Sequence, residues 1–182
     1  MKYGDLDQAL QHTKAAMYIA EEYEGRNTHY FRHLGQIAGI LRAMGRYEEA
    51  LKHYKTLLVY VHENNDAMLI HLYNTNISTV YLALNKPQEA LEHLEIAMDL
   101  ARKQRGIALG EVQRNRAKAY ELLGNYDAEY ICLKEAVPLL ENAYGCDHMK
   151  VVEAGHRLTE LEKRVRQYKS RGKLIKVYCR LM

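Results

Sequence analysis

Apolar positions recur along the chain with the spacing of amphipathic helices. In the segments that begin at Tyr47 and Pro87, apolar residues fall near i, i+3, i+4 and i+7, on one face of a helix. Helix-breaking turns separate such segments at intervals of 41, 40 and 39 residues, centred on Gly4, Gly45, Asn85 and Gly124. This period predicts a stack of similar helical hairpins, each burying its apolar face against its neighbours.

Small residues stand at fixed places relative to each turn. Five residues after the turn come Ala9, Ala50 and Ala90. Seven residues before it stand Ala38, Ser78 and Ala117. Small side chains let paired helix backbones approach closely, while Tyr and Leu fill the remaining space. Each repeat is therefore predicted to be an antiparallel pair of helices.

The pattern predicts a single domain over residues 1–182. Its expected helices are 3–24, 29–43, 47–63, 67–84, 87–104, 107–123, 126–143 and 147–168. The pairs are 29–63, 67–104 and 107–143, and 147–182 forms a C-terminal helix or cap with a basic tail. Helix 3–24 is a second helix without its first. We therefore expect a fragment of a longer protein, or a contact supplied by another chain or by downstream residues. Pro138 should bend its helix locally.

The repeats resemble a known family at LGQIAGILRAMGRYEEALKHYKTLL, NISTVYLALNKPQEALEHLEIAM and RAKAYELLGNYDAEYICLKEAV. These segments are similar to the tetratricopeptide repeat family, most closely its long-repeat, kinesin light chain variety. A further likeness is GCDHMKVVEAGHRLTELEKR, where Met149 stands in place of the family's proline. The resemblance covers roughly residues 1–165. It implies an all-α, right-handed superhelical solenoid of about three full repeats, with half repeats at the ends.

Composition is that of a soluble globular protein, with 48% hydrophobic and 27% charged residues. Fifteen tyrosines against one phenylalanine and no tryptophan indicate many rings with a buried body and an accessible hydroxyl. Three cysteines without CxxC spacing favour reduced thiols, at Cys132, Cys146 and Cys179. No apolar run is long enough to span a bilayer, and we expect a cytoplasmic protein.

Catalytic and cofactor motifs are missing from the sequence. It has no Gly-rich phosphate loop and no GxSxG, so we expect no enzyme and no cofactor. His29 and His33 share a helix face at a spacing that could hold a metal, but no HExxH order supports them. We therefore expect no metal site.

A concave groove lined by the first helices is the surface expected to carry function. The candidate contact residues are Arg32, Gln36, Leu72, Thr75, Asn76, Thr79, Glu111, Arg114, Asn115 and Lys118. In the family, an Asn at the place of Asn76 and Asn115 commonly bonds the backbone of a bound peptide; alternatively, both bond neighbouring repeats. Arg114 and Lys118 favour a partner with acidic residues or a free carboxylate, unless Glu111 pairs internally with Arg114 on a solvated face.

The last twenty residues carry eight basic residues and no acidic one. This segment is either a degenerate partner helix containing Gly172 or a frayed tail. Its charge could attract nucleic acid, an anionic membrane surface or an acidic partner. Alternatively, it could keep the outer face of a capping helix solvated. Apolar residues such as Leu174 and Ile175 favour packing on the stack or on a second copy. Nucleic-acid binding is not expected.

Two functions are open at this stage. The first is a non-enzymatic scaffold or adaptor that holds a partner's peptide segment in its groove, with homo-oligomerisation through exposed terminal helices as a further possibility. The alternative is a peptide-sensing regulatory domain of a larger signalling or transcription-regulatory protein. The resemblance alone does not choose between them, because one fold hosts many functions.

Overall fold

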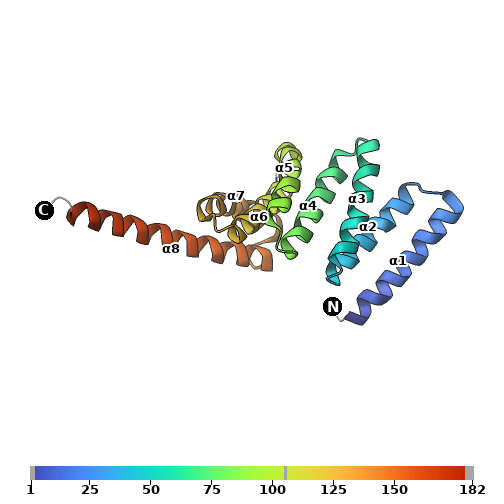
Figure 1. The fold of residues 1–182 in the computed structure, drawn as a ribbon, viewed down its shortest axis with the longest axis horizontal. Coiled ribbons are helices and arrows are strands. Elements are labelled where there is room, and N and C mark those ends of the chain that lie inside the picture. The colour runs from blue at the N-terminus through green and yellow to red at the C-terminus, as the bar shows by residue number, and fades with distance from the viewer. Residues whose placement is uncertain (1–2, 105, 179–182) are drawn as a thin grey trace. The chain divides into compact units, whose positions relative to one another are not determined.

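The computed structural model describes residues 3–104 and 106–178, and every regular element within these residues is an α-helix (Figure 1). The helices are α1 (Tyr3–Glu24), α2 (Thr28–Ala43), α3 (Tyr47–Glu63), α4 (Ala67–Ala83), α5 (Pro87–Gln104), α6 (Ile107–Leu122), α7 (Tyr126–Tyr144) and α8 (Met149–Tyr178). We call α2, α4, α6 and α8 first helices and α1, α3, α5 and α7 second helices. The predicted all-α repeat fold is confirmed, and up to α7 the helix bounds agree with the predicted ones to within one residue.

Each helix pair is joined by a turn whose central residue has a positive φ, namely Gly45, Asn85 or Gly124. At the first of these turns the Gly45 amide donates to the Arg42 carbonyl, and the next amide donates to the Leu41 carbonyl at 2.9 Å. This pattern closes the end of a helix around a left-handed residue, a conformation that glycine and asparagine adopt at least cost. A second set of left-handed residues separates successive pairs: Gly25, Asn65, Gly106 and Gly145.

Two sequence predictions at the ends of the chain are wrong. Gly4 lies inside the first turn of α1 and does not form a turn before it. At the other end, α8 continues through Gly172 to Tyr178, so this segment is neither a separate partner helix nor a frayed tail. The reason is the same at both ends: a glycine costs a helix only about 1 kcal/mol, and no proline interrupts α8.

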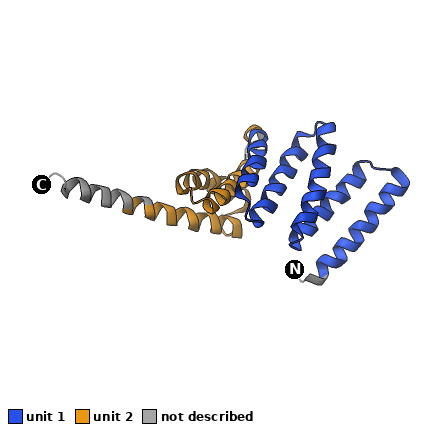
Figure 2. Cartoon of the chain, in the orientation of Figure 1, with its two compact units in different colours: residues 1–100 blue, residues 101–182 orange. Residues whose placement is uncertain are grey.

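The chain divides into two compact units, unit 1 (residues 1–100) and unit 2 (residues 101–182) (Figure 2). In unit 1, α1 packs on α2, α2 on α3 and α3 on α4. Its core is apolar and rich in tyrosine, with Tyr30, Tyr54 and Tyr73 buried among aliphatic side chains. Phe31 stacks on Tyr60, with ring centroids 3.7 Å apart, and so joins α2 to α3.

Unit 2 packs α6 against α7 and α7 against α8. Gly110 allows the first of these contacts, because a Cβ at this position would lie 3.1 Å from the Leu139 Cβ. Among the described residues, its core includes two small apolar clusters, one around Cys132 and Leu133, the other around Leu140. Pro138 lies inside α7, and the helix continues beyond it to Tyr144. The bend expected there stays a prediction.

No helix among the described residues is both long and apolar enough to cross a membrane. Cys132 and Cys146 are free thiols, the first buried and the second exposed. Side chains from position 168 onward lie outside the described residues, as do Cys179, Arg180 and Leu181 entirely. The predicted role of the basic tail therefore stays a prediction.

Candidate functional site

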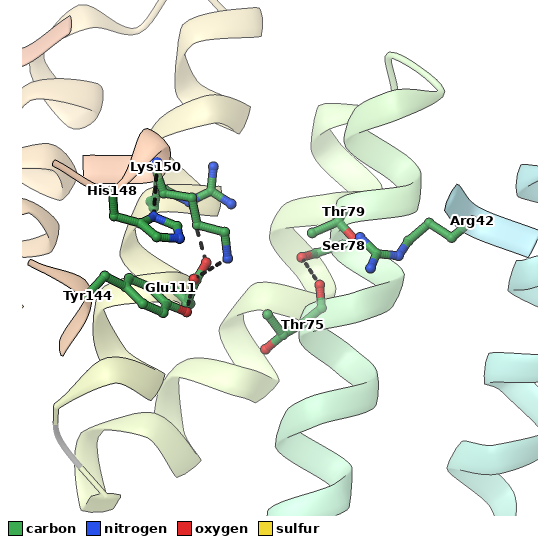
Figure 3. A network of polar contacts seen from close by, with 9 residues as sticks. Arg42, Thr75, Ser78, Thr79, Glu111, Tyr144, His148 and Lys150 are labelled. Carbon is green, nitrogen blue, oxygen red and sulfur yellow. Dashed lines mark hydrogen bonds and ion pairs between the residues drawn. The ribbon is translucent and has the colours of Figure 1, made fainter. Parts of the chain in front are cut away.

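In unit 1, the polar side chains of α4 that we expected to meet a partner bond mainly to their own helix. Thr79 donates its hydroxyl to the Asn76 carbonyl at 2.7 Å, and Thr75 donates to the His71 carbonyl at 2.9 Å. Arg42 on α2 reaches the Thr79 hydroxyl at 3.4 Å, which links the two first helices (Figure 3). The single O–H donor of each threonine is therefore used within the protein, and its oxygen can only accept from a ligand.

Four other predicted contact residues of unit 1 keep exposed surface. Arg32, Gln36 and Leu72 are exposed, and Asn76 is half-buried. His33 lies 3.1 Å from the Gln36 side-chain oxygen, and the His29 ring lies 2.9 Å from a Glu24 carboxylate oxygen. Each of these two histidines is therefore within hydrogen-bonding distance of another side chain of the protein. Among the described residues, no group of three or more His, Cys, Asp or Glu side chains is arranged to hold a metal.

In unit 2, a cavity of about 130 Å³ lies between the first helices α6 and α8, above α7. It is lined by three cations, three carboxylates and three apolar side chains: Arg114, Ala117, Lys118, Glu121, Glu129, Leu133, Glu153, Ala154 and Arg157. Two of the predicted contact residues, Arg114 and Lys118, therefore lie together at one cavity.

Arg157 and Glu129 form the buried ion pair of this cavity. The guanidinium donates to both carboxylate oxygens, at 2.5 and 3.0 Å, and the Glu129 side chain is only 1% exposed. The hydrogen bonds to Glu129 raise the pKa of Arg157, so its charge is permanent. A bidentate pair of this kind is rigid, and removing either partner would leave a buried charge without compensation. It forms a fixed wall of the cavity.

The other two cations are held more loosely. Lys118 donates to Glu121 at 2.7 Å, and Arg114 lies 3.4 Å from Glu111. Both contacts join residues three positions apart on α6. Pairs of this kind on a helix surface contribute little to stability.

Glu111 is the centre of a separate polar network (Figure 3). It accepts hydrogen bonds from the Tyr144 hydroxyl at 2.8 Å and from the Lys150 ammonium. Burial raises the pKa of Glu111, but these bonds outweigh it, so the pKa is lowered overall. Burial together with the bond to Glu111 raises the pKa of Tyr144 to about 12. Glu111 thus joins α6 to α7 and α8. Its contact with Arg114 is the internal pair that the sequence analysis gave as the alternative to an acidic partner.

Asn115 is buried, and its expected bond to a peptide backbone stays a prediction. Its side chain is 3% exposed, whereas Asn76 at the equivalent place in α4 is half-buried. The side chains that do pair within each repeat stand two positions earlier. The Asn74 side-chain oxygen accepts from the His93 ring at 2.8 Å, and Gln113 donates to Glu135.

Comparison with known families now decides the classification. Tetratricopeptide repeat models match residues 34–68 and 68–142. The chain belongs to the tetratricopeptide repeat family. This family is generally a non-enzymatic fold for protein interaction. No curated protein sequence matches the chain significantly.

Solved structures show the same tetratricopeptide fold at low sequence identity. BtubC (BKLC) from P. vanneervenii is 16% identical, with a TM-score of 0.76, over 96% of this chain and 74% of that one. A kinesin light chain-type protein of Podosopora anserina with nearly identical TPR-like repeats is 16% identical, with a TM-score of 0.70, over 95% and 84%. A double mutant of MamA from strain RS-1 is 17% identical, with a TM-score of 0.54, over 88% and 92%. At these identities the likeness concerns the fold alone.

Sequence reasoning missed Arg157, Glu129 and Glu153, although the tetratricopeptide register could have found one of them. Arg157 follows Lys118 by 39 residues, which is the interval between the last two repeat turns. Equivalent positions on neighbouring first helices face the same side of the repeat stack. Arg157 was overlooked because no recognisable turn follows it in α8.

Proposed function

We propose that this tetratricopeptide repeat protein is a non-enzymatic scaffold, and that the cavity of unit 2 takes a carboxylate of a partner's peptide segment. The proposal rests on one observation: Arg114 and Lys118 both line a cavity between two first helices. Arg and Lys side chains at a concave site are the groups that recognise acidic peptide motifs and free C-termini.

Both cations can turn to a ligand without leaving a carboxylate unpaired. When Arg114 leaves Glu111, that carboxylate keeps its bonds from Tyr144 and Lys150. When Lys118 leaves Glu121, a Glu121 oxygen still lies 3.7 Å from Arg157. Arg157 itself must stay with Glu129, because breaking a buried pair costs about 3 to 5 kcal/mol. We therefore assign the ligand carboxylate to Arg114 and Lys118.

The apolar part of the cavity lining suits a small apolar group next to that carboxylate. Ala117, Ala154 and Leu133 form it, and the two alanines leave room. A cavity of about 130 Å³ has room for several water molecules. We infer a peptide whose carboxylate is flanked by one short apolar side chain.

In unit 1, the surface of Arg32, Gln36, Leu72 and Asn76 is proposed as a second contact region for a partner. Leu72 supplies an exposed apolar surface, and the amides of Gln36 and Asn76 can pair with a peptide backbone. Thr75 and Thr79 can contribute through their methyl groups or as hydrogen-bond acceptors, since their O–H donors are bonded to α4. The cytoplasmic location stays a prediction from the sequence.

The test uses two fluorescent pools of random octapeptides, one with a free C-terminal carboxylate and one amidated. We expect the free-acid pool to bind more tightly, and Arg114→Ala with Lys118→Ala to weaken its binding about tenfold, or about 1.4 kcal/mol. The matched control is Lys52→Ala with Lys55→Ala, two exposed cations on the second helix α3. Equal binding of both pools to the wild-type protein, or equal losses in the two double variants, would refute the carboxylate site.

A further inference from the structure

The cavity of unit 2 presents opposite charges from its two first helices. From α6 come Arg114 and Lys118, the two cations that can turn to a ligand. From α8 comes Glu153, whose carboxylate lines the same cavity and is exposed to solvent. Among the residues that the structure describes, the Glu153 side chain has no hydrogen-bond or ion-pair partner. The α8 side of the cavity thus offers an acceptor that the fold does not use.

The cations nearest to Glu153 along α8 are engaged elsewhere. Lys150 precedes it by three positions and binds Glu111, while Arg157 follows it by four positions and binds Glu129. Residues three or four positions apart are neighbours on a helix surface, so these are the cations of α8 that could otherwise pair with Glu153. Glu153 therefore keeps its negative charge for a ligand.

The balance of charge in the cavity lining indicates what that ligand should carry. The lining has as many cations as carboxylates, so it is formally neutral. Two of the carboxylates already lie against a cation, Glu121 at 2.7 Å from Lys118 and Glu129 at 2.5 Å from Arg157. A ligand that brings only a carboxylate would place it near Glu153 as a like charge, which disfavours binding. A ligand with both a carboxylate and a cation can pair with both helices.

We propose that Glu153 binds a basic side chain of the partner peptide, next to the carboxylate that Arg114 and Lys118 hold. This inference rests on the proposed function, because that carboxylate places the basic group. The ligand is then a peptide with a small apolar C-terminal residue preceded by a lysine or an arginine. The aliphatic stem of the basic residue can lie on the apolar part of the lining while its charged end stays in water, as Glu153 does.

The experiment uses three fluorescent octapeptides of glycine and serine that end in alanine with a free carboxylate. They differ only in the residue before the alanine, which is lysine, norleucine or glutamate. We expect the full chain to bind the lysine peptide about fivefold more tightly than the norleucine peptide, which is the gain from one exposed ion pair, and to bind the glutamate peptide most weakly.

Two variants and a control assign this preference to one side chain. Glu153→Gln should bring the lysine and norleucine peptides to equal affinity, because the countercharge is gone. Glu153→Lys should make the glutamate peptide the tightest of the three. The control Glu141→Gln removes an exposed carboxylate of α7 that does not line the cavity, and it should keep the order of the wild-type protein.

The results that contradict this inference differ from those that contradict the proposed function. Equal affinity of the wild-type protein for the lysine and norleucine peptides would refute the role of Glu153 and leave the carboxylate site standing. A preference for lysine that persists in Glu153→Gln, or that Glu141→Gln loses as fully, would also refute it. If the amidated lysine peptide binds as tightly as the free acid, or if no free-acid peptide binds, the carboxylate site fails and this inference fails with it.

Discussion

Units 1 and 2 use the same helix pairs but fill them differently. Unit 1 is held by an apolar core in which Tyr54, Leu57 and Ile77 are almost wholly buried. Unit 2 has smaller apolar clusters and adds charged contacts to them, with Glu129 held by Arg157 and Glu111 held by Lys150 and Tyr144. The repeat backbone thus tolerates either interior, and the unit with charged interior contacts is also the one with a charged cavity.

The largest expected effect is the loss of apolar packing in unit 1. Leu57 is fully buried, so Leu57→Ala leaves a cavity and should lower the free energy of unfolding by about 4 kcal/mol. Hydrogen exchange of α2 to α4 should rise first, because contacts in repeat proteins are local. Val59→Ala, at an exposed position of the same helix, should change exchange little. Equal effects of both variants would contradict the assignment of the core.

Breaking the buried pair should have the largest effect in unit 2. Glu129→Gln removes the one buried carboxylate that the Arg157 guanidinium binds through two hydrogen bonds, and should cost about 3 kcal/mol. Hydrogen exchange of α7 and α8 reports the loss. The control is Glu160→Gln, which removes an exposed carboxylate from the same arginine. If the control were as damaging as Glu129→Gln, burial of the pair would not be the cause.

The Glu111 network should make unit 2 sensitive to acid. Because the pKa of Glu111 is lowered in the fold, its stabilisation is present above the ordinary carboxyl value of about 4.3 and is lost as the pH falls through the lowered value. Glu111→Gln should cost about 1.5 kcal/mol at neutral pH and reduce the loss below pH 4 or so. Urea unfolding at a series of pH values tests this, and an unchanged pH profile in the variant would contradict it.

Unit 1 should respond to acid at a higher pH and more weakly. Burial, with a further effect of Lys55, lowers the pKa of His93, which bonds Asn74 and stacks on Tyr81. A base with a lowered pKa is neutral in the fold, so its contribution is lost as the pH falls below about 6.5 towards the lowered value. We expect less than about 1 kcal/mol, since the ring is partly solvated. His93→Gln should flatten the stability of unit 1 between pH 7 and 5, and His62→Gln should leave the slope as it is.

The helices could be predicted closely from the sequence because the apolar spacing and the turn residues agree. Gly45, Asn85 and Gly124 take the left-handed conformation that their residue types favour. Gly4 has the same residue type but lies within α1, since glycine permits a turn without requiring one. For the same reason, Gly172 did not reveal from the sequence that α8 continues through it.

The candidate site was only partly predictable. The register placed Arg114 and Lys118 on the first-helix face, and the structure brings them to one cavity. It could not show that Asn115 is buried while Asn76 keeps some exposure, because that depends on how closely the neighbouring helices approach. Nor could it show the Arg157–Glu129 pair, which joins residues from different helices.

The most direct test of the carboxylate site is a charge swap. We predict that Arg114→Glu with Lys118→Glu abolishes binding of the free-acid octapeptide pool and creates binding of an amidated, lysine-rich pool, both measured by fluorescence anisotropy. Such a reversal follows if these two side chains meet the charge of the ligand. Undiminished binding of the free-acid pool by the double variant would contradict the proposed function.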